Sequence, residues 1–156
     1  MATASEKGTL IRLFLTETGN IIQEIRRGKE TALIRDICFD NFNNLIACCS
    51  DRGTIHIWSF EDGLKTNKKN DIEKIENAPK NQKSIFSPFP SFFSGGFFKS
   101  DWSFANVRIK DTNSICYFGK DNSIFIASTQ GNFYKAFIDL KKGGDCEIKE
   151  KIKFVK

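Results

Sequence analysis

An all-β fold is predicted by three features of this 156-residue sequence. Short stretches that alternate apolar and polar residues recur between turn-forming groups of Gly, Asn and Asp, with no helical periodicity between them. A hydrophobic content of 40% against 28% charged residues is typical of a globular domain with a core. The pattern Ser-x-x-Gly, followed two residues later by an apolar residue, occurs three times. Together these features favour a sheet protein built from a repeated unit.

The strands are expected in two groups. The first lies in residues 1–60, where turns such as Thr18-Gly19-Asn20 separate five stretches: Thr9–Leu15, Ile21–Ile25, Leu33–Phe39, Leu45–Cys49 and Thr54–Phe60. Residues 61–101 break the pattern, which resumes over residues 114–154. The break predicts an insert within an otherwise regular β-domain.

The repeat identifies the architecture. Its first copy begins at Ser5, the second at Ser50, 45 positions later, and the third at Ser128, a further 78 positions on. Removing an insert of roughly 35 residues from 61–101 restores the first spacing, and a period of about 40–45 residues is typical of four-stranded WD-type propeller blades. Because a propeller usually needs about four to eight blades to close, residues 1–156 are expected to form about three blades of a larger one.

Two adjacent arginines mark the candidate binding site. Arg26 and Arg27 follow a stretch that reads as a strand, and Gly28 then gives the backbone freedom to turn. Neighbouring strand residues point to opposite faces of a sheet. The pair therefore predicts two separate anion sites, one on each side of the strand, although a solvated pair at a strand end is the simpler alternative.

Charge and cysteine usage exclude several classes of function. The net charge of +5 is spread without a long basic tract, so nucleic acid is not an expected partner. Five cysteines include no CxxC pair and there is one histidine, so we expect no metal and no cofactor. A single histidine also leaves no nucleophile–base pair to propose, and the chain is not expected to be an enzyme. Without a signal peptide or a run of 18 apolar residues, a reduced, cytoplasmic protein is expected.

Several of these stretches resemble one protein family. Residues 2–12, 25–28 and 50–58, with Trp102-Ser103-Phe104 and 131–137, are similar to the PROPPINs, the seven-bladed phosphoinositide-binding β-propellers of autophagy, known in animals as WIPI proteins. The resemblance covers the chain apart from the insert and maps onto the fifth, sixth and seventh blades. The hallmark of the family is Phe-Arg-Arg-Gly, in which Ile25 here replaces the Phe.

The resemblance implies two headgroup pockets. The first would combine Arg26 with Ser5, Thr9 and Arg12. The second would combine Arg27 with Ser50, Thr54 and His56. Strand alternation places Thr54 and His56 on one face but does not place Thr9 and Arg12 together. The first pocket of the family also uses an upstream histidine that this chain lacks, so we expect that pocket to be incomplete here.

The two pockets suit phosphorylated inositol. Guanidinium groups bind phosphate oxygens bidentately, while Ser and Thr hydroxyls fill the remaining acceptors. His56, near its usual pKa of about 6.5, is expected to become a cation when a phosphate approaches, so that affinity rises from about pH 7.5 toward 6. A structural role is the alternative for a lone histidine on a strand.

The insert over 61–101 is expected to be largely flexible, because residues 61–83 are rich in Lys, Asn, Asp and Glu. In the family, a loop at this place, between the third and fourth strands of blade six, dips into the bilayer. We therefore expect membrane insertion of four side chains, Phe86, Phe89, Phe92 and Phe93, and burial of Phe97 and Phe98 in the core. The alternative places all six in the core.

The resulting hypothesis is a peripheral membrane effector that recognises phosphatidylinositol 3-phosphate and phosphatidylinositol 3,5-bisphosphate in autophagy or endolysosomal traffic. Its expected partners are phosphoinositide-containing membranes and proteins of the autophagy machinery. It would be cytoplasmic and associated with autophagosomal precursor, endosomal or vacuolar membranes. The alternative is a WD-type protein-interaction scaffold that binds no lipid.

Overall fold

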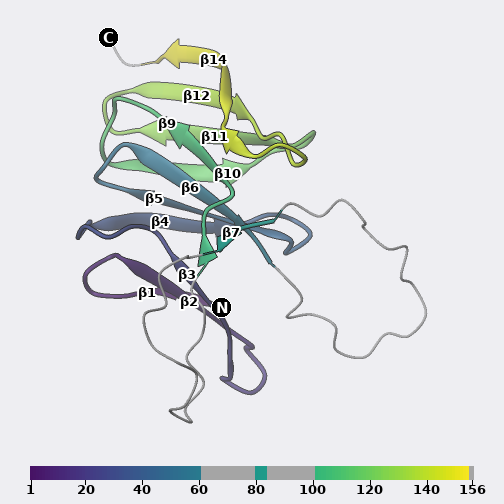
Figure 1. The fold of residues 1–156 in the computed structure, drawn as a ribbon. Coiled ribbons are helices and arrows are strands. Elements are labelled where there is room, and N and C mark those ends of the chain that lie inside the picture. The colour runs from purple at the N-terminus through teal and green to yellow at the C-terminus, as the bar shows by residue number, and fades with distance from the viewer. Residues whose placement is uncertain (61–79, 84–100, 155–156) are drawn as a thin grey trace.

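Three β-sheets, one above another, make up the described part of the chain (Figure 1). The computed structural model describes residues 1–60, 80–83 and 101–154. The first sheet has the order β1-β2-β3-β8-β7, formed by Ala2–Ala4, Leu10–Phe14, Ile21–Arg26, Asp101–Trp102 and Gln82–Lys83. The second has the order β13-β9-β6-β5-β4, formed by Gly144–Asp145, Ala105–Arg108, Thr54–Ser59, Leu45–Ser50 and Ile34–Phe39. The third has the order β10-β11-β12-β14, formed by Ser114–Phe118, Ser123–Ser128, Asn132–Phe137 and Glu147–Lys153.

The predicted strands are confirmed, with small changes at their ends. Each of the five stretches expected in residues 1–60 forms one strand, from β2 to β6. The second sheet contains the expected antiparallel four-stranded unit β4-β5-β6-β9, and the third sheet is another. The first sheet differs, because β7 from within the insert and β8 from its end join the edge of this sheet beside β3.

The repeated Ser-x-x-Gly motif forms an equivalent hairpin turn in each sheet. In each copy the Ser hydroxyl oxygen accepts a backbone N–H from a residue two to five positions further on. The donors are Leu10 to Ser5 at 3.1 Å, Arg52 to Ser50 at 3.3 Å and Asn132 to Ser128 at 3.3 Å. The glycines have positive φ, 63° at Gly8 and 69° at Gly53. A Cβ at either position would also collide with a backbone carbonyl oxygen, 1.9 Å and 2.6 Å away. The motif is therefore fixed by turn geometry and close chain approach.

The core fills the two spaces between the three sheets. Strand β5 is buried along its whole length, so its residues alternate between the two spaces. One set packs toward the first sheet with Trp58, in a cluster of Ile11, Leu13, Ile25, Ile46 and Cys48. The other set packs toward the third sheet against residues of β6, β9, β10 and β11. The second sheet is thus covered on both faces.

The third sheet leaves one face open. In β10 the residues Ser114, Cys116 and Phe118 are buried, whereas Ile115 and Tyr117 between them are exposed. This alternation is the period of a half-buried strand. None of the described residues forms a helix that is long and apolar enough to cross a bilayer.

The insert is fixed to the folded part at two places. Near its middle, Asn81 is buried, accepts the backbone N–H of Ser59 at 2.8 Å and donates to the Ser59 carbonyl at 2.7 Å. On the returning side, Asp101 and Trp102 pair in parallel with Ile25 and Arg26. The polar composition of residues 61–83 did not predict this anchor at Asn81. Residues 61–79 and 84–100 of the insert lie outside the described residues.

Candidate functional site

The two arginines point to opposite sides of the first sheet. Strand β3 ends at Arg26, which lies opposite Leu10, and the N–H of Arg27 continues the pairing by donating to the Thr9 carbonyl at 2.9 Å. Ile25 is fully buried against the second sheet, and Arg27, two residues on, is only 6% exposed. Arg26 therefore lies on the face away from the second sheet, and Arg27 points toward it.

Arg27 is held by backbone carbonyls. Its Nε donates to the Gly8 carbonyl at 2.9 Å, and its Nη2 donates to the Glu30 carbonyl. Burial lowers its pKa from the usual value, and the charge of Arg52 lowers it further, yet an arginine of this kind stays protonated at neutral pH. Two of the five guanidinium donors orient the group, and the others remain for a ligand.

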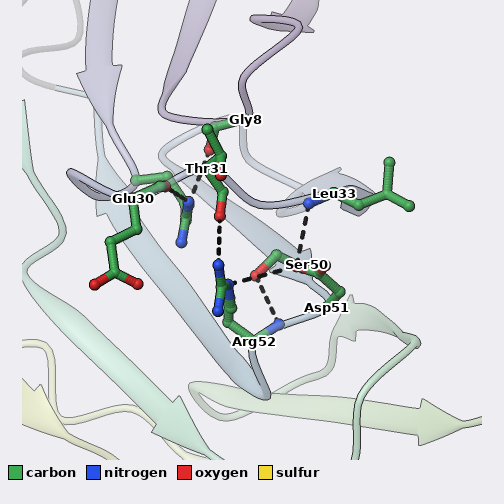
Figure 2. Close-up of polar contacts among 8 residues, drawn as sticks. Gly8, Glu30, Thr31, Leu33, Ser50, Asp51 and Arg52 are labelled. Carbon is green, nitrogen blue, oxygen red and sulfur yellow. Dashed lines mark hydrogen bonds and ion pairs between the residues drawn. The ribbon is translucent and has the colours of Figure 1, made fainter.

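The loop from Gly28 to Leu33, which follows the arginine pair, is hydrogen-bonded to the turn between β5 and β6. Figure 2 shows Arg52 directed at the Thr31 carbonyl, to which its Nη2 donates at 2.9 Å. The Leu33 N–H donates to the Asp51 carboxylate at 3.1 Å, also drawn in Figure 2. The turn between β5 and β6 thus holds the loop that follows the arginine pair, which preorganises Arg27.

The other residues predicted for the second pocket face Arg27. Thr54 and His56 alternate along β6 with Ile55 and Ile57, which are buried toward the third sheet, so Thr54 and His56 lie on the side of the first sheet. Ser50 is buried at the end of β5, where its hydroxyl oxygen accepts the Arg52 N–H at 3.3 Å. The structure brings these four residues together between the first two sheets.

His56 is neutral at physiological pH in this structure. Burial lowers its pKa to about 4, and the charges of Arg27 and Arg108 act in the same direction. The imidazole stacks on Trp58, with ring centroids 5.7 Å apart, and its Nδ1 lies 3.1 Å from the Ser103 hydroxyl oxygen. The expectation that His56 titrates near 6.5 is therefore wrong for the unliganded chain, because two nearby cations and desolvation oppose its protonation.

This shift predicts an acid-sensitive contribution to stability. The unfolded chain takes up a proton at His56 near pH 6.5, whereas the folded chain resists it until about pH 4. Stability is therefore lost as pH falls through that interval, by about 2 kcal/mol between pH 7 and pH 5. Urea unfolding of the wild type and of His56→Gln at both pH values measures it. Equal losses in the two proteins would contradict the prediction.

Arg52 and Arg108 are two further cations near this pocket that the sequence did not identify. Arg52 lies between Ser50 and Gly53, and its charge acts on Arg27. Arg108 lies opposite Thr54 in the β6–β9 register, and its charge acts on His56. For Arg52 a signal was present, because the first repeat carries Lys7 at the same position. Arg108 had none, since the insert separates it from the motif.

The first pocket is only partly assembled. Arg12 lies opposite Glu24 in the β2–β3 register, and Arg26 lies opposite Leu10, so the two arginines share the face away from the second sheet. Arg12 is paired with Glu24, Nε to Oε2, at 3.0 Å. Thr9 instead stands opposite Arg27, so the structure does not place it on the face of Arg26 with which it was predicted to act. Strand alternation had already separated Thr9 from Arg12.

Ser5 completes the predicted set for the first pocket, and its hydroxyl is already bonded in the turn of the first repeat. The predicted membrane-inserting side chains, Phe86, Phe89, Phe92 and Phe93, lie outside the described residues, as do Phe97 and Phe98.

The second pocket has the chemistry of an anion site. A buried guanidinium with free donors, two hydroxyls and an imidazole lie on facing sides of it. The charges of Arg52 and Arg108 act on it, although Arg52 donates to the Thr31 carbonyl and Arg108 is paired with Asp145. Arg27 is fixed by neutral carbonyls, so its positive charge is not cancelled by a bonded carboxylate among the described residues. Such a group binds a phosphate more strongly than it would in water, because the local dielectric constant is lower.

Autophagy-related proteins of other organisms match nearly the whole chain. Autophagy-related protein 21 of Schizosaccharomyces pombe is 30% identical over 161 residues, covering 99% of this chain and 45% of the relative. Autophagy-related protein 18e of Arabidopsis thaliana is 30% identical over 156 residues, covering 99% and 38%. The chain therefore spans less than half the length of these relatives.

Solved structures agree on the fold. Hsv2 of Kluyveromyces lactis superposes with a TM-score of 0.69 at 21% identity, covering 99% of this chain and 44% of that one. The β-propeller domain of Myceliophteria thermophila Swd1 gives 0.52 at 9% identity, covering 91% and 32%. The three sheets are therefore blades of a β-propeller. The family model described as PROPPIN matches residues 1–154, and the chain belongs to the PROPPIN family.

Proposed function

We propose that this chain is part of a peripheral membrane effector that recognises phosphatidylinositol 3-phosphate and phosphatidylinositol 3,5-bisphosphate. The observation that carries the proposal is the buried guanidinium of Arg27, held by two backbone carbonyls and facing Thr54 and His56. A monophosphate or bisphosphate headgroup supplies the dense negative charge and the acceptors that these donors need.

The next interface between sheets supports this interpretation by contrast. Between the second and third sheets the buried charged residue is Asp111, whose carboxylate accepts from Ser128 at 2.5 Å and from Asn132 at 2.7 Å. That charge is satisfied by two side-chain donors, as buried charges usually are. Arg27, between the first and second sheets, uses two of its five guanidinium donors on backbone carbonyls. The others can bind a ligand, which is expected of a binding group.

The cellular role follows the family. Relatives of this chain are named autophagy-related proteins, so we place the effector in autophagy or endolysosomal traffic, in the cytoplasm and at the membranes of autophagosomal precursors, endosomes or vacuoles. It would act by binding rather than by catalysis. A related structure is a complex of KlAtg21 with the coiled coil of AgAtg16, which supports autophagy proteins as partners here too.

A protein-interaction scaffold without lipid binding is the second candidate, and that same complex favours it. Flotation with phosphatidylcholine vesicles, with and without phosphatidylinositol 3-phosphate, separates the two. The effector requires binding that depends on the phosphoinositide. If the folded protein binds neither kind of vesicle, the scaffold without lipid binding is the remaining candidate.

Membrane insertion is predicted to be separable from headgroup recognition. Replacing Phe86, Phe89, Phe92 and Phe93 with Ser is expected to weaken vesicle binding strongly, because a buried Phe contributes roughly 1.5–3 kcal/mol. Binding of soluble inositol 1,3-bisphosphate, measured by calorimetry, should stay nearly unchanged. The remaining vesicle binding should be more sensitive to salt, since charged contacts are screened and apolar burial is not.

Phe42→Ser is the matched control, because Phe42 is exposed in the turn between β4 and β5. It is expected to change neither assay. A parallel fall in soluble headgroup binding by the fourfold variant would show that these Phe side chains belong to the core. Unchanged vesicle binding would show that they are neither core nor anchor.

A further inference from the structure

His56 is hydrogen-bonded to a residue from beyond the insert. Its Nδ1 lies 3.1 Å from the Oγ of Ser103, which directly follows β8 and is 7% exposed. The Ser103 hydroxyl in turn donates to the Oδ1 of Asn106 at 2.9 Å. Asn106 lies directly opposite His56 in the β6–β9 register. The three side chains form a partly buried chain of hydrogen bonds that ends at the imidazole.

The proton count in this chain fixes the state of the ring. A serine hydroxyl has one proton to donate and lone pairs with which to accept. Because the Ser103 proton is used on Asn106, Ser103 can only accept from His56. Neutral His56 then carries its proton on Nδ1, and Nε2, at the other end of the ring, presents a lone pair.

We propose that Ser103 and Asn106 are positioning residues that hold neutral His56 in the Nδ1–H tautomer, so that a phosphate reaching Nε2 is bound with uptake of one proton. The inference rests on the proposed function for its ligand. A phosphate dianion would meet a lone pair at Nε2 and be repelled. Binding therefore needs a proton between the two atoms, taken from solvent by Nε2 or brought by a monoprotonated phosphate.

The groups around His56 allow the ring to take up this proton only when a phosphate is bound. The positive charges of Arg27, at the end of β3, and of Arg108, on β9, act on the ring, although Arg108 is also paired with the exposed Asp145 at 3.1 Å. Cys48 lies opposite the ring on β5 as a buried neutral thiol. Without an anion, burial and the two arginines keep the ring neutral, and they outweigh a hydrogen bond with Asn106 that acts to raise its pKa. A bound phosphate reverses the balance by placing negative charge beside Nε2. Headgroup binding at this pocket is therefore strengthened by acid.

The tautomer can be observed without any lipid. His56 is the single histidine of the chain, so its two ring nitrogens give the only imidazole signals in a long-range ¹H–¹⁵N NMR spectrum. The wild-type chain at neutral pH is expected to show Nδ1 protonated and Nε2 bare. Ser103→Ala should move the population toward Nε2–H, the form that free imidazole side chains prefer. Ser103→Thr keeps a hydroxyl and should keep the wild-type pattern.

An Nε2–H signal in the wild type would overturn the proposal, because Ser103 would then be the donor to His56. An unchanged tautomer in Ser103→Ala would overturn it as well. Both results are independent of lipid binding, so they are distinguishable from a failure of the proposed function.

The proton uptake is tested by calorimetry with inositol 1,3-bisphosphate across pH, using the 156-residue chain. His56→Ala is the reference, since it shares the titration of the phosphate itself. The affinity of the wild type relative to this reference should rise up to tenfold for each unit of falling pH, as one-proton linkage requires. In Ser103→Ala the relative affinity should be nearly constant, because Nε2–H donates without a further proton.

If the affinity of the wild type relative to His56→Ala does not change with pH, the proposed proton uptake is wrong. If the wild type binds no inositol phosphate at any pH, the proposed function and the uptake fail together, while the tautomer is still decided by NMR.

Discussion

Replacing Arg26 and Arg27 together with threonine is expected to abolish phosphoinositide-dependent vesicle binding. The two guanidinium groups serve opposite faces of the first sheet, so a single change leaves one pocket and the double change leaves none. Removing one partner of a buried, hydrogen-bonded charge pair typically costs about 2–5 kcal/mol, which is about a thirtyfold loss of affinity or more at the pocket of the buried Arg27. Vesicle flotation with phosphatidylinositol 3-phosphate measures the loss.

The fold should survive this change with reduced stability. Arg27 donates to the carbonyls of Gly8 and Glu30, and losing those bonds costs about 1–3 kcal/mol. Arg35→Thr is the matched control, because Arg35 is exposed on β4 and away from both pockets. It is expected to leave vesicle binding unchanged. Undiminished binding by a folded double variant would refute the lipid hypothesis.

Asp111→Ala is expected to destabilise the chain by about 3 kcal/mol, the largest effect on folding that we predict. The carboxylate is 3% exposed and joins the side chains of Ser128 and Asn132, which Ala would leave without their acceptor. Burial tends to raise the pKa of Asp111, but hydrogen bonds from Ser128 and Asn132 outweigh it and hold the pKa below its usual value. The contribution is therefore present at neutral pH and is lost as pH falls through the lowered pKa.

Urea unfolding at neutral pH measures this change. Glu147→Ala is the control, since the Glu147 carboxylate forms an exposed pair with Lys149, and pairs of that kind contribute less than about 1 kcal/mol. Similar losses in both variants would show that the buried bonds around Asp111 do not stabilise the fold.

The fold could be predicted because its signals are local. Alternation along β2 to β6 and the three Ser-x-x-Gly turns depend on residues a few positions apart, and strand period and turn chemistry can be read directly from them. The opposite orientation of Arg26 and Arg27 followed from the same period. The structure adds the β2–β3 register, which places Arg12 on the face of Arg26, a relation that alternation along one strand cannot give.

The electrostatics of the pocket could not be predicted, because they come from residues far apart in the sequence. Ser103 is 47 positions from His56, and the insert separates them. The charges of Arg27 and Arg108 that lower the pKa of His56 come from two different strand ends. A pKa depends on burial and on such neighbours, neither of which a linear motif specifies.

The central claim is that Arg27 and its neighbours between the first two sheets form one phosphate pocket, independent of the face that carries Arg26. Calorimetric titration of Arg26→Thr and of Arg27→Thr with soluble inositol 1,3-bisphosphate tests it most directly. Arg26→Thr should retain a single site with the acid dependence of His56, and Arg27→Thr should lose that site. Retention of an acid-dependent site by Arg27→Thr, with its fold intact by circular dichroism, would contradict the claim.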